Sequence, residues 1–388
     1  MANMRKIEVN EATVGTWAAI DLLMAEEMYE ETFIPTCVVM HWSSKHPSVT
    51  VAACEDGDVI IPDEARKLGH VPGRRLASPG GLGIFTPGLP LVAYYYQKPY
   101  SKPDVTLHKE ADANGEANAE ALRKLGFKAT YRSIGDTEVI VDDVNLKVIA
   151  SAATNFFRND YWYTCTSIIW DPLPPTSMEV FSKSVEVPPE KFQDKKTKSL
   201  TARMKPLHEI VQEENFNITK EDVIRASIEE NAKLLGAEIY KDSWKQNEIE
   251  FINNLKPFFH SNTWLTKFSS KRMLSNASPD YFYGRAAYKS RKLITSKAIV
   301  DKKGIIKDIL VSGDWLVRPF PTVTSDGIVR DFYNKLNGLR IDDEKAIYDA
   351  VNSIFQRDDF EAPLIEPEHV VAPILKSSEN LKPVKDIF

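Results

Sequence analysis

Two adjacent arginines lead into a glycine-rich loop, and this stretch is the part of the sequence best suited to bind an anion. Glycines let a backbone turn tightly, and successive N–H groups in such a turn form a concave anion site. Two guanidiniums add forked donors that match phosphate or carboxylate. Because the chain has a formal net charge of -6, the pair is a local feature. The run is Arg74, Arg75, Leu76, Ala77, Ser78, Pro79, Gly80, Gly81, Leu82 and Gly83.

The loop does not match the two commonest nucleotide-binding motifs. No Lys-Ser or Lys-Thr closes it, which excludes a Walker loop. The G-x-G-x-x-G spacing is absent, and the preceding residues 63–72 are typical of a polar helix and turn, which excludes a Rossmann fingerprint. An ordinary surface turn remains the alternative, because proline and glycine clusters most often mark turns.

A second candidate is Lys147, which stands at the head of a strand of small and apolar residues, from Val148 to Ala152. A lysine in this place can point its charge into a pocket with a floor of small side chains, where it would hold a carboxylate beside a phosphate. The alternative is a lysine on the solvent face of a hairpin. The segment from Gly135 to Glu138 precedes that hairpin and adds two carboxylates, Asp136 and Glu138.

The surrounding pattern predicts the elements that position these residues. Apolar residues at helical spacing predict a long first helix over 10–31, and Thr219 is a candidate N-cap for another helix. Alternating segments around an Asp-Asp turn predict a β-hairpin at 137–152. Further strands are expected at 36–42, 48–53, 88–96, 163–170, 304–313 and 315–317, and further helices at 62–68, 111–125, 177–187, 246–255, 327–336 and 343–355.

Length and composition narrow the class of protein. The 388 residues, 43% hydrophobic and 27% charged, are typical of a soluble chain of about two or three domains. No apolar run approaches the ~18–20 residues that cross a bilayer, and the polar N-terminus has no signal-peptide core. Three separated cysteines, Cys37, Cys54 and Cys165, favour the cytoplasm and no zinc site. The negative charge argues against nucleic acid as a partner, and we expect a monomer.

Taken together, the two segments resemble the lipoate–protein ligase family, within the biotin/lipoate ligase fold. The arginine-glycine loop matches that family's Arg-Arg and three-glycine motif, residues 135–138 match its Gly-Arg-Asn-Asp motif, and residues 147–152 match its catalytic-lysine strand. The likeness extends over 10–357. It implies an α+β fold with a catalytic domain at 1–268 and a small accessory domain at 271–357. The proline-rich, charged tail at 358–388 is expected to be a wrapping or partly disordered arm.

The resemblance also implies a reaction and a set of site residues. ATP and lipoate would give lipoyl-AMP, and a lysine of a lipoyl carrier would then attack it; such carriers include the acyltransferase component of a 2-oxoacid dehydrogenase and the glycine cleavage H protein. Lys147 would be catalytic, and Asp136 and Glu138 would hold Mg²⁺. The acyl pocket would include Val92, Tyr94, Val148 and Ala150. The ATP or adenylate phosphate would be bound by Arg74, Arg75, Ser78, Gly80, Gly81, Gly83, Phe85 and Thr166.

Several motif positions depart from the family pattern and keep two alternatives open. The family's His-Asp pair is Thr86 and Pro87, its Asn-Asp pair is Thr137 and Glu138, and Pro79 interrupts the glycine run. These changes suit a regulatory homologue that binds a carrier or acyl-adenylate without turnover. Octanoyltransferases of the same fold use a cysteine near the positions of Arg132 or Asn159, and neither is cysteine here. Cys165 is interpreted as a small core residue.

Overall fold

The first domain is built on one mixed sheet. The computed structural model describes residues 2–28, 30, 33–78, 80–98, 105–133, 136–156, 161–186, 188–192 and 204–387. In spatial order the strands are β11 (Ala237–Lys241), β1 (Ala2–Ala12), β2 (Thr36–Trp42), β6 (Leu91–Gln97), β10 (Tyr161–Ile168), β9 (Val144–Phe156), β8 (Asp136–Val141) and β7 (Ala129–Tyr131). The β11–β1–β2 pairs are parallel and the others are antiparallel.

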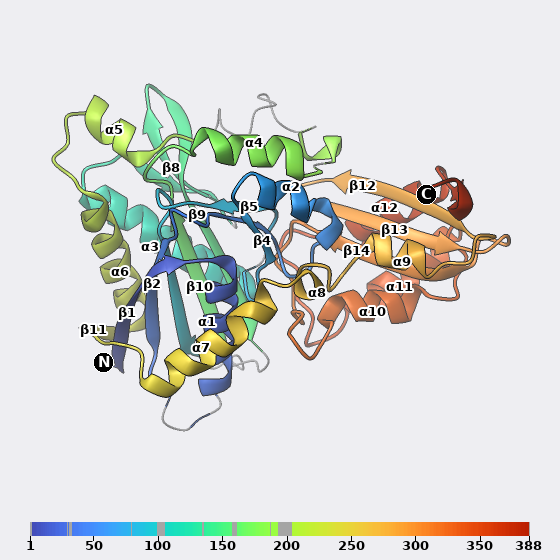
Figure 1. Ribbon diagram of the computed structural model, residues 1–388, viewed down its shortest axis with the longest axis horizontal. Coiled ribbons are helices and arrows are strands. Elements are labelled where there is room, and N and C mark those ends of the chain that lie inside the picture. The colour runs from blue at the N-terminus through green and yellow to red at the C-terminus, as the bar shows by residue number, and fades with distance from the viewer. Residues whose placement is uncertain are drawn as a thin grey trace.

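Helices cover both faces of this sheet, as Figure 1 shows. One face carries α1 (Val14–Glu27) and α7 (Gln246–Phe259), followed by the short α8 (Asn262–Leu265). The other face carries α3 (Leu107–Lys124), α5 (Leu207–Glu213) and α6 (Lys220–Leu235). The side chains of each strand alternate between these two faces, so each face has its own buried apolar cluster.

A small three-stranded sheet carries the glycine loop. Its order is β4 (Val71–Arg74), β3 (Ser48–Val51) and β5 (Gly83–Phe85), and the loop joins β4 to β5. The 3₁₀-helix η1 (Gly57–Val59), α2 (Pro62–Lys67) and α4 (Pro175–Ser184) lie beside this sheet, and their apolar residues share a buried cluster with it. The loop is therefore held between two regular strands.

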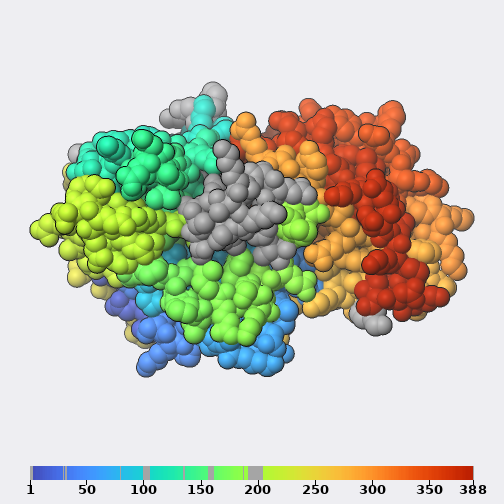
Figure 2. All heavy atoms as spheres, turned by 90° about the horizontal axis from the view of Figure 1, so that it is seen from above, coloured from blue at the N-terminus to red at the C-terminus, as the bar shows by residue number. Residues whose placement is uncertain are grey.

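The second domain is an antiparallel sheet covered by helices. Its strand order is β14 (Ile306–Gly313), β13 (Leu293–Val300), β12 (Phe282–Lys289) and β15 (Lys382–Pro383). Its helices are α9 (Ser270–Ser275), α10 (Gly327–Leu336), α11 (Glu344–Phe355) and α12 (Pro367–Ser378), with the 3₁₀-helix η4 (Val384–Asp386) near the C-terminus. The first domain contacts the second through the 3₁₀-helix η2 (Pro189–Phe192), where Glu190 Oε1 lies 3.8 Å from Lys376 Nζ. Figure 2 shows light-green atoms of the first domain against the orange second domain.

The C-terminal residues differ from the expected wrapping or partly disordered arm. They form α12, which packs its apolar side on β12 and β13, and β15, which pairs with Phe282 and Tyr283. Pro367 occupies the first turn of α12, where its missing N–H costs nothing, and Val370, Val371 and Ile374 recur at helical spacing. The second domain thus extends through residue 387.

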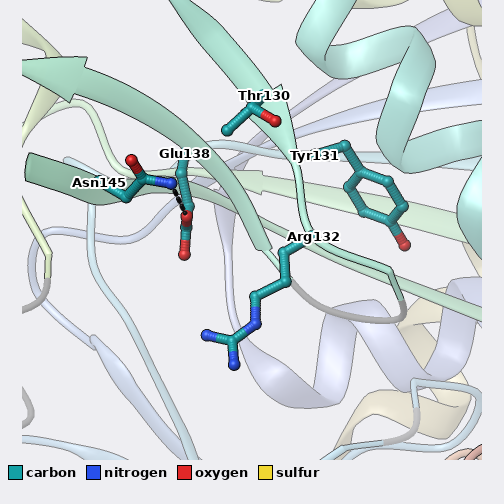
Figure 3. A pocket seen from close by; sticks show the side chains of 5 residues that line it. All are labelled: Thr130, Tyr131, Arg132, Glu138 and Asn145. Carbon is teal, nitrogen blue, oxygen red and sulfur yellow. Dashed lines mark hydrogen bonds between the residues drawn. The ribbon is translucent and has the colours of Figure 1, made fainter. Parts of the chain in front are cut away.

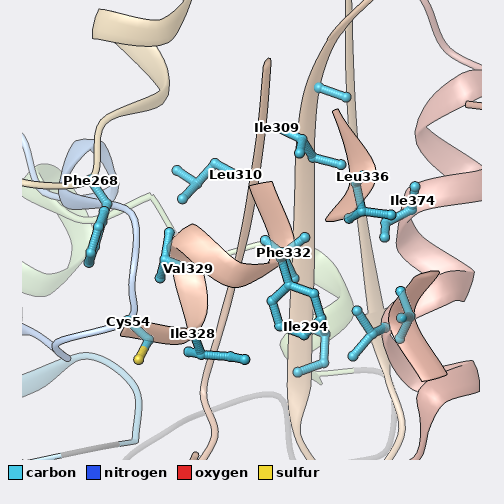
Figure 4. Packing of buried hydrophobic residues seen from close by; sticks show 14 of the residues in the cluster. Cys54, Phe268, Ile294, Ile309, Leu310, Ile328, Val329, Phe332, Leu336 and Ile374 are labelled. Carbon is cyan, nitrogen blue, oxygen red and sulfur yellow. The ribbon is translucent and has the colours of Figure 1, made fainter. Parts of the chain in front are cut away.

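The two domains share a buried interface. Ala53 and Cys54 of the first domain pack into the apolar cluster of the second, and Figure 4 shows Cys54 near Phe268 and Ile328. A buried ion pair joins Asp56 to Lys297 of β13. Ser270 Oγ also donates to Asp56 at 2.6 Å, and the Gly57 N–H donates to the Phe268 carbonyl at 2.8 Å. Polar and apolar contacts together hold the domains in one arrangement.

Candidate functional site

The glycine loop is fixed by hydrogen bonds at both ends. The Arg75 backbone N–H donates to the Val51 carbonyl at 3.0 Å, and the Ala77 N–H donates to the Asp21 carboxylate at 3.3 Å. Gly80 has a φ of 97°, a conformation that glycine adopts at little cost and other residues avoid. Gly81 accepts a hydrogen bond from the Arg75 guanidinium through its carbonyl. Hydrogen bonds within the protein therefore hold the described residues of the loop in place.

Arg74 serves as an internal clamp. Its guanidinium is fully buried and donates to six backbone carbonyl oxygens, at 2.8 to 3.4 Å, and lies over the Phe268 ring at 5.2 Å. Burial lowers its pKa to about 10, against the opposing effect of nearby acids such as Asp56. The carbonyls belong to Ala52, Ala53, Glu55, Trp264, Leu265 and Phe268. Its donors thus join the first domain to the segment that leads into the second.

Arg75 and Ser78 connect the loop to the central sheet. The Arg75 guanidinium donates to Ser78 Oγ at 3.4 Å, and Ser78 Oγ lies 3.8 Å from Cys165 Sγ on β10. Burial lowers the pKa of the Arg75 guanidinium. Because Ser78 contacts Cys165, the loop lies on the sheet face to which Cys165 points, which is the face covered by α1.

Lys147 lies on the same face as the loop. Its Nζ is 2.6 Å from Asp136 Oδ1, and each side chain is about one-quarter exposed. Asp136 pairs with Ala150, and Cys165 pairs with Ala152, two residues further along β9. Residues opposite each other, and residues two apart on a strand, share a face. The register thus brings Lys147, Asp136 and Ala150 to the face that carries Ser78.

Glu138 lines an open pocket beside Lys147. The pocket has a volume of about 410 Å³, and Figure 3 shows its lining, which also includes Thr130, Tyr131, Arg132 and Asn145. Glu138 is buried, pairs with Lys147 across β8 and β9, and accepts a hydrogen bond from Asn145 Nδ2 at 2.9 Å. This is a polar hollow at the strand edge.

The two predicted metal ligands do not form a ready-made metal site. Asp136 is engaged by Lys147, and Glu138 is engaged by Asn145. Within the described ranges, no group of three histidine, cysteine or acidic side chains is gathered closely enough to hold an ion. Mg²⁺ prefers oxygen ligands in a near-octahedral arrangement, which these two carboxylates alone do not supply.

Most of the predicted acyl-pocket residues lie on the opposite sheet face. Val92, Tyr94 and Val148 are fully buried in the cluster packed under α3, α5 and α6. Ala150, half-buried, is on the face of the loop. The sequence pattern predicted these strands, but it did not indicate which of the alternating side chains point toward the loop.

The remaining predicted residues are also divided between the two faces. Phe85 packs against Trp17 and Trp42, with ring centroids 5.2 and 4.7 Å away, on the α1 face. Thr166 accepts a hydrogen bond from Asn118 Nδ2 of α3 at 2.8 Å, on the other face. Gly83 has no side chain, and its backbone carbonyl accepts a hydrogen bond from the Thr50 hydroxyl at 3.3 Å. Pro79, Gly135, Asn159 and residues 193–203 lie outside the described residues.

An acid that the sequence analysis missed sits beneath the loop. Asp21 of α1 is fully buried, accepts the Tyr95 hydroxyl at 2.6 Å and also accepts the Ala77 N–H. Burial raises its pKa to about 7, although these hydrogen bonds oppose the rise. A lone aspartate within the apolar run from Trp17 to Ala25 was the signal that could have revealed it. Buried acids are usually bound to a specific partner.

Comparisons with known proteins identify the fold. The sequence matches no family model and no curated protein. P. falciparum LipL1, solved in complex with lipoate, has a TM-score of 0.64 at 13% identity, covering 96% of this chain and 100% of its own. The bipartite lipoate protein ligase of Thermoplasma acidophilum, studied with its E2 lipoyl domain, has a TM-score of 0.54 at 17% identity, covering 68% of this chain and 96% of its own.

A third structure, lipoate-protein ligase A bound with ATP, has a TM-score of 0.51 at 15% identity, covering 68% of this chain and 98% of its own. The chain therefore has the lipoate–protein ligase fold, and the resemblance noted in the sequence is confirmed at that level. The α+β class is also confirmed. Among the helices in the described ranges, none combines the length and apolar character that crossing a membrane requires.

Proposed function

We propose that this protein is an ATP-dependent ligase that activates lipoate as lipoyl-AMP and transfers the lipoyl group to a lysine of a small carrier domain. The observation that carries this proposal is the placement of Lys147 on the same sheet face as the glycine loop. Solved proteins of this fold, at low identity, include ligases bound to lipoate and to ATP, and one studied with an E2 lipoyl domain.

The chemistry requires two anions to meet. A carboxylate oxygen attacks the α-phosphorus of ATP, and pyrophosphate leaves. Arg75 and the loop N–H groups would reduce the repulsion between the reactants, because fixed donors stabilise negative charge without reorganisation. Lys147 would exchange Asp136 for the carboxylate and the phosphate and hold them in line. Arg74 would act indirectly, through the loop geometry.

The transfer step needs no nucleophile from this chain. The acceptor lysine amine attacks the carbonyl carbon of lipoyl-AMP, the amide C–N bond forms, and AMP leaves with the electrons of the broken C–O bond. A cysteine-dependent acyl transfer fits less well, because burial raises the pKa of the Cys165 thiol to about 11 and Cys37 and Cys54 are also buried. Ala150 is a candidate contact for the acyl chain, and the polar pocket lined by Glu138 is a candidate contact for the carrier.

Lys147→Ala tests the proposal. Wild-type protein with lipoate, ATP and Mg²⁺ should catalyse exchange of labelled pyrophosphate into ATP and should add one lipoyl mass to a lipoyl domain. Lys147→Ala should lose both. Lys128→Ala, which removes an exposed lysine just before β7, should retain both. Exchange by Lys147→Ala at the wild-type rate would contradict the assignment of this lysine.

The second candidate function is binding of a lipoyl carrier or acyl-adenylate without turnover. Two observations favour it: Lys147 is already paired with Asp136, and the Arg74 guanidinium donates to backbone carbonyls and lies over the Phe268 ring. Measured binding of a lipoyl domain by wild-type protein, with no mass gain and no pyrophosphate exchange, would support this candidate against the first.

A further inference from the structure

The second domain touches the glycine loop directly. Gly80 forms an isolated antiparallel bridge with Trp315, two residues after the end of β14. Trp315 is almost fully buried and belongs to the apolar cluster of the second domain. The bridge therefore ties the most conformationally demanding residue of the loop to a rigid part of the other domain.

Asp314, next to Trp315, brings a carboxylate to the same place. A Cβ atom added to Gly80 would lie 3.9 Å from Asp314 Oδ1, the nearest atom among the described residues other than the chain neighbours of Gly80. The Asp314 backbone N–H donates to the Leu293 carbonyl at 2.8 Å, which fixes Asp314 beside the first residue of β13. The loop thus already has an acid beside it.

The charge of Asp314 reaches Arg75. Burial lowers the pKa of the Arg75 guanidinium, and four nearby ionisable groups act in the opposite direction: Cys165, Tyr163, Asp314 and Glu55. Cys165 and Tyr163 are themselves buried, and burial raises the pKa of both, so they stay neutral near pH 7. Asp314 and Glu55 are the carboxylates of this set.

The domain interface keeps Asp314 in this position. The Asp56–Lys297 ion pair and the packing of Cys54 join the first domain to the second, and Lys297 lies on β13, the neighbour of β14. Withdrawal of Asp314 by a rigid movement of the second domain would break these contacts together. The acid therefore stays beside the loop unless its own side chain turns away.

We propose that Asp314 is a resident counter-ion of the glycine loop that competes with the phosphate groups of an incoming nucleotide and so sets the affinity of the site for anions. The idea rests on the proposed function, because it assumes that this loop receives phosphate. Two negative groups near one guanidinium repel each other, and the repulsion is strong where water is excluded. The second domain thereby limits nucleotide binding in the first.

Asp314→Asn tests this, because it keeps the shape of the side chain and removes its charge. We expect ATP and inorganic tripolyphosphate to bind the variant about fivefold tighter or more than wild type by titration calorimetry, since one unit charge a few ångströms away is worth about 1 kcal/mol or more. Asp314→Ala should change the affinity in the same direction. Asp342→Asn is the control: it removes an exposed acid paired with Arg340 near the opposite end of β14.

The outcomes separate the two hypotheses. Wild-type protein that binds ATP with the same or higher affinity than Asp314→Asn would overturn the role of Asp314 and leave the ligase proposal intact. Binding by the variant alone would support the role of Asp314 and count against ATP use by the wild type. Absence of binding in both, or equal tightening by Asp342→Asn, would overturn the role of Asp314; absence in both would also contradict the ligase proposal.

Discussion

The buried ion pair between Asp56 and Lys297 should carry much of the strength of the domain interface. Lys297→Met keeps most of the side-chain volume and removes the charge. Asp56 would then remain buried with hydrogen bonds from Ser270 Oγ at 2.6 Å and the Asp58 N–H at 3.0 Å, but without a cation. In the wild type, the Lys297 ammonium and these hydrogen bonds keep the pKa of Asp56 low, although burial acts to raise it.

The expected loss of unfolding free energy is about 3–5 kcal/mol, the range for removing one partner of a buried pair. Less than one-tenth of either side chain is exposed, so solvent screening is weak. The double variant Asp56→Asn/Lys297→Met should recover part of this loss, because no unpaired charge then remains. Together with the single variant Asp56→Asn, these proteins complete a double-mutant cycle that gives the coupling energy between the two side chains.

Urea unfolding followed by tryptophan fluorescence and by far-ultraviolet dichroism gives the measurement. Lys302→Met is the matched control, since Lys302 pairs with Asp280 at 3.6 Å while both side chains are mostly exposed. It should change the unfolding free energy by about 0–1 kcal/mol. A Lys297→Met variant within 1 kcal/mol of wild type would refute the reasoning, because the pair would then not stabilise the interface.

Three further predictions concern the groups around the loop. Burial raises the pKa of Asp21 to about 7 in the fold, from an ordinary value of 3.8, so the folded state holds its proton more tightly. Stability should therefore fall by about 3 kcal/mol from pH 4 to pH 7, and pH-dependent urea titrations should find this fall absent in Asp21→Asn. Arg74→Lys should lower the unfolding free energy by about 2–4 kcal/mol, because one ammonium cannot donate hydrogen bonds to six carbonyls. Arg66→Lys, at an exposed arginine, is the control, and an equal loss there would contradict the prediction. Glu361 accepts hydrogen bonds from the first two N–H groups of α3, at 2.9 and 3.2 Å. Glu361→Ala should therefore lower the unfolding free energy by about 1–2 kcal/mol and speed hydrogen exchange in the first turn of α3. Unchanged exchange would count against this capping role.

Strong local signals made much of the fold predictable. The strand at 36–42 and the helix at 327–336 agree with β2 and α10 to the residue. Thr219 caps α6 as predicted, because its hydroxyl and the Asp222 carboxylate satisfy each other's backbone N–H groups. The first helix begins later than expected, at Val14, because Thr13 caps it and the preceding residues form β1.

Elements that depend on distant partners were missed. β1 reads as polar, and its pairing with β11 and β2 comes from segments that are remote in the chain. β12 and β13 lie in a segment rich in lysine and arginine, and that composition concealed their alternation. Segment 315–317, expected as a strand, has only an isolated bridge. Tertiary context decides such cases, since strand formation depends on packing against neighbours.

The same reason limited the prediction of the site. Residues 74 and 75 are both arginine, so their sequence does not distinguish their roles. In the fold, Arg74 donates to buried backbone carbonyls, whereas Arg75 donates to Ser78 of the loop. On β6, adjacent residues face opposite sides of the sheet: Tyr94 is buried in one apolar cluster and Tyr95 in the other. An error of one position in the expected register therefore assigns every side chain to the wrong face. Asp314 belongs to a different domain, and local sequence gives no indication of its approach to Gly80.

The Arg74 clamp has a consequence for the order in which the chain folds during synthesis. Its carbonyl partners at 52–55 emerge early, but Leu265 and Phe268 follow about two hundred residues later. β1 likewise waits for β11 at 237–241. Such long-range contacts slow folding. Until residue 268 has left the ribosome, Arg74 lacks acceptors at 264–268, so the loop that it supports should mature late, once the first domain has been synthesised to its end.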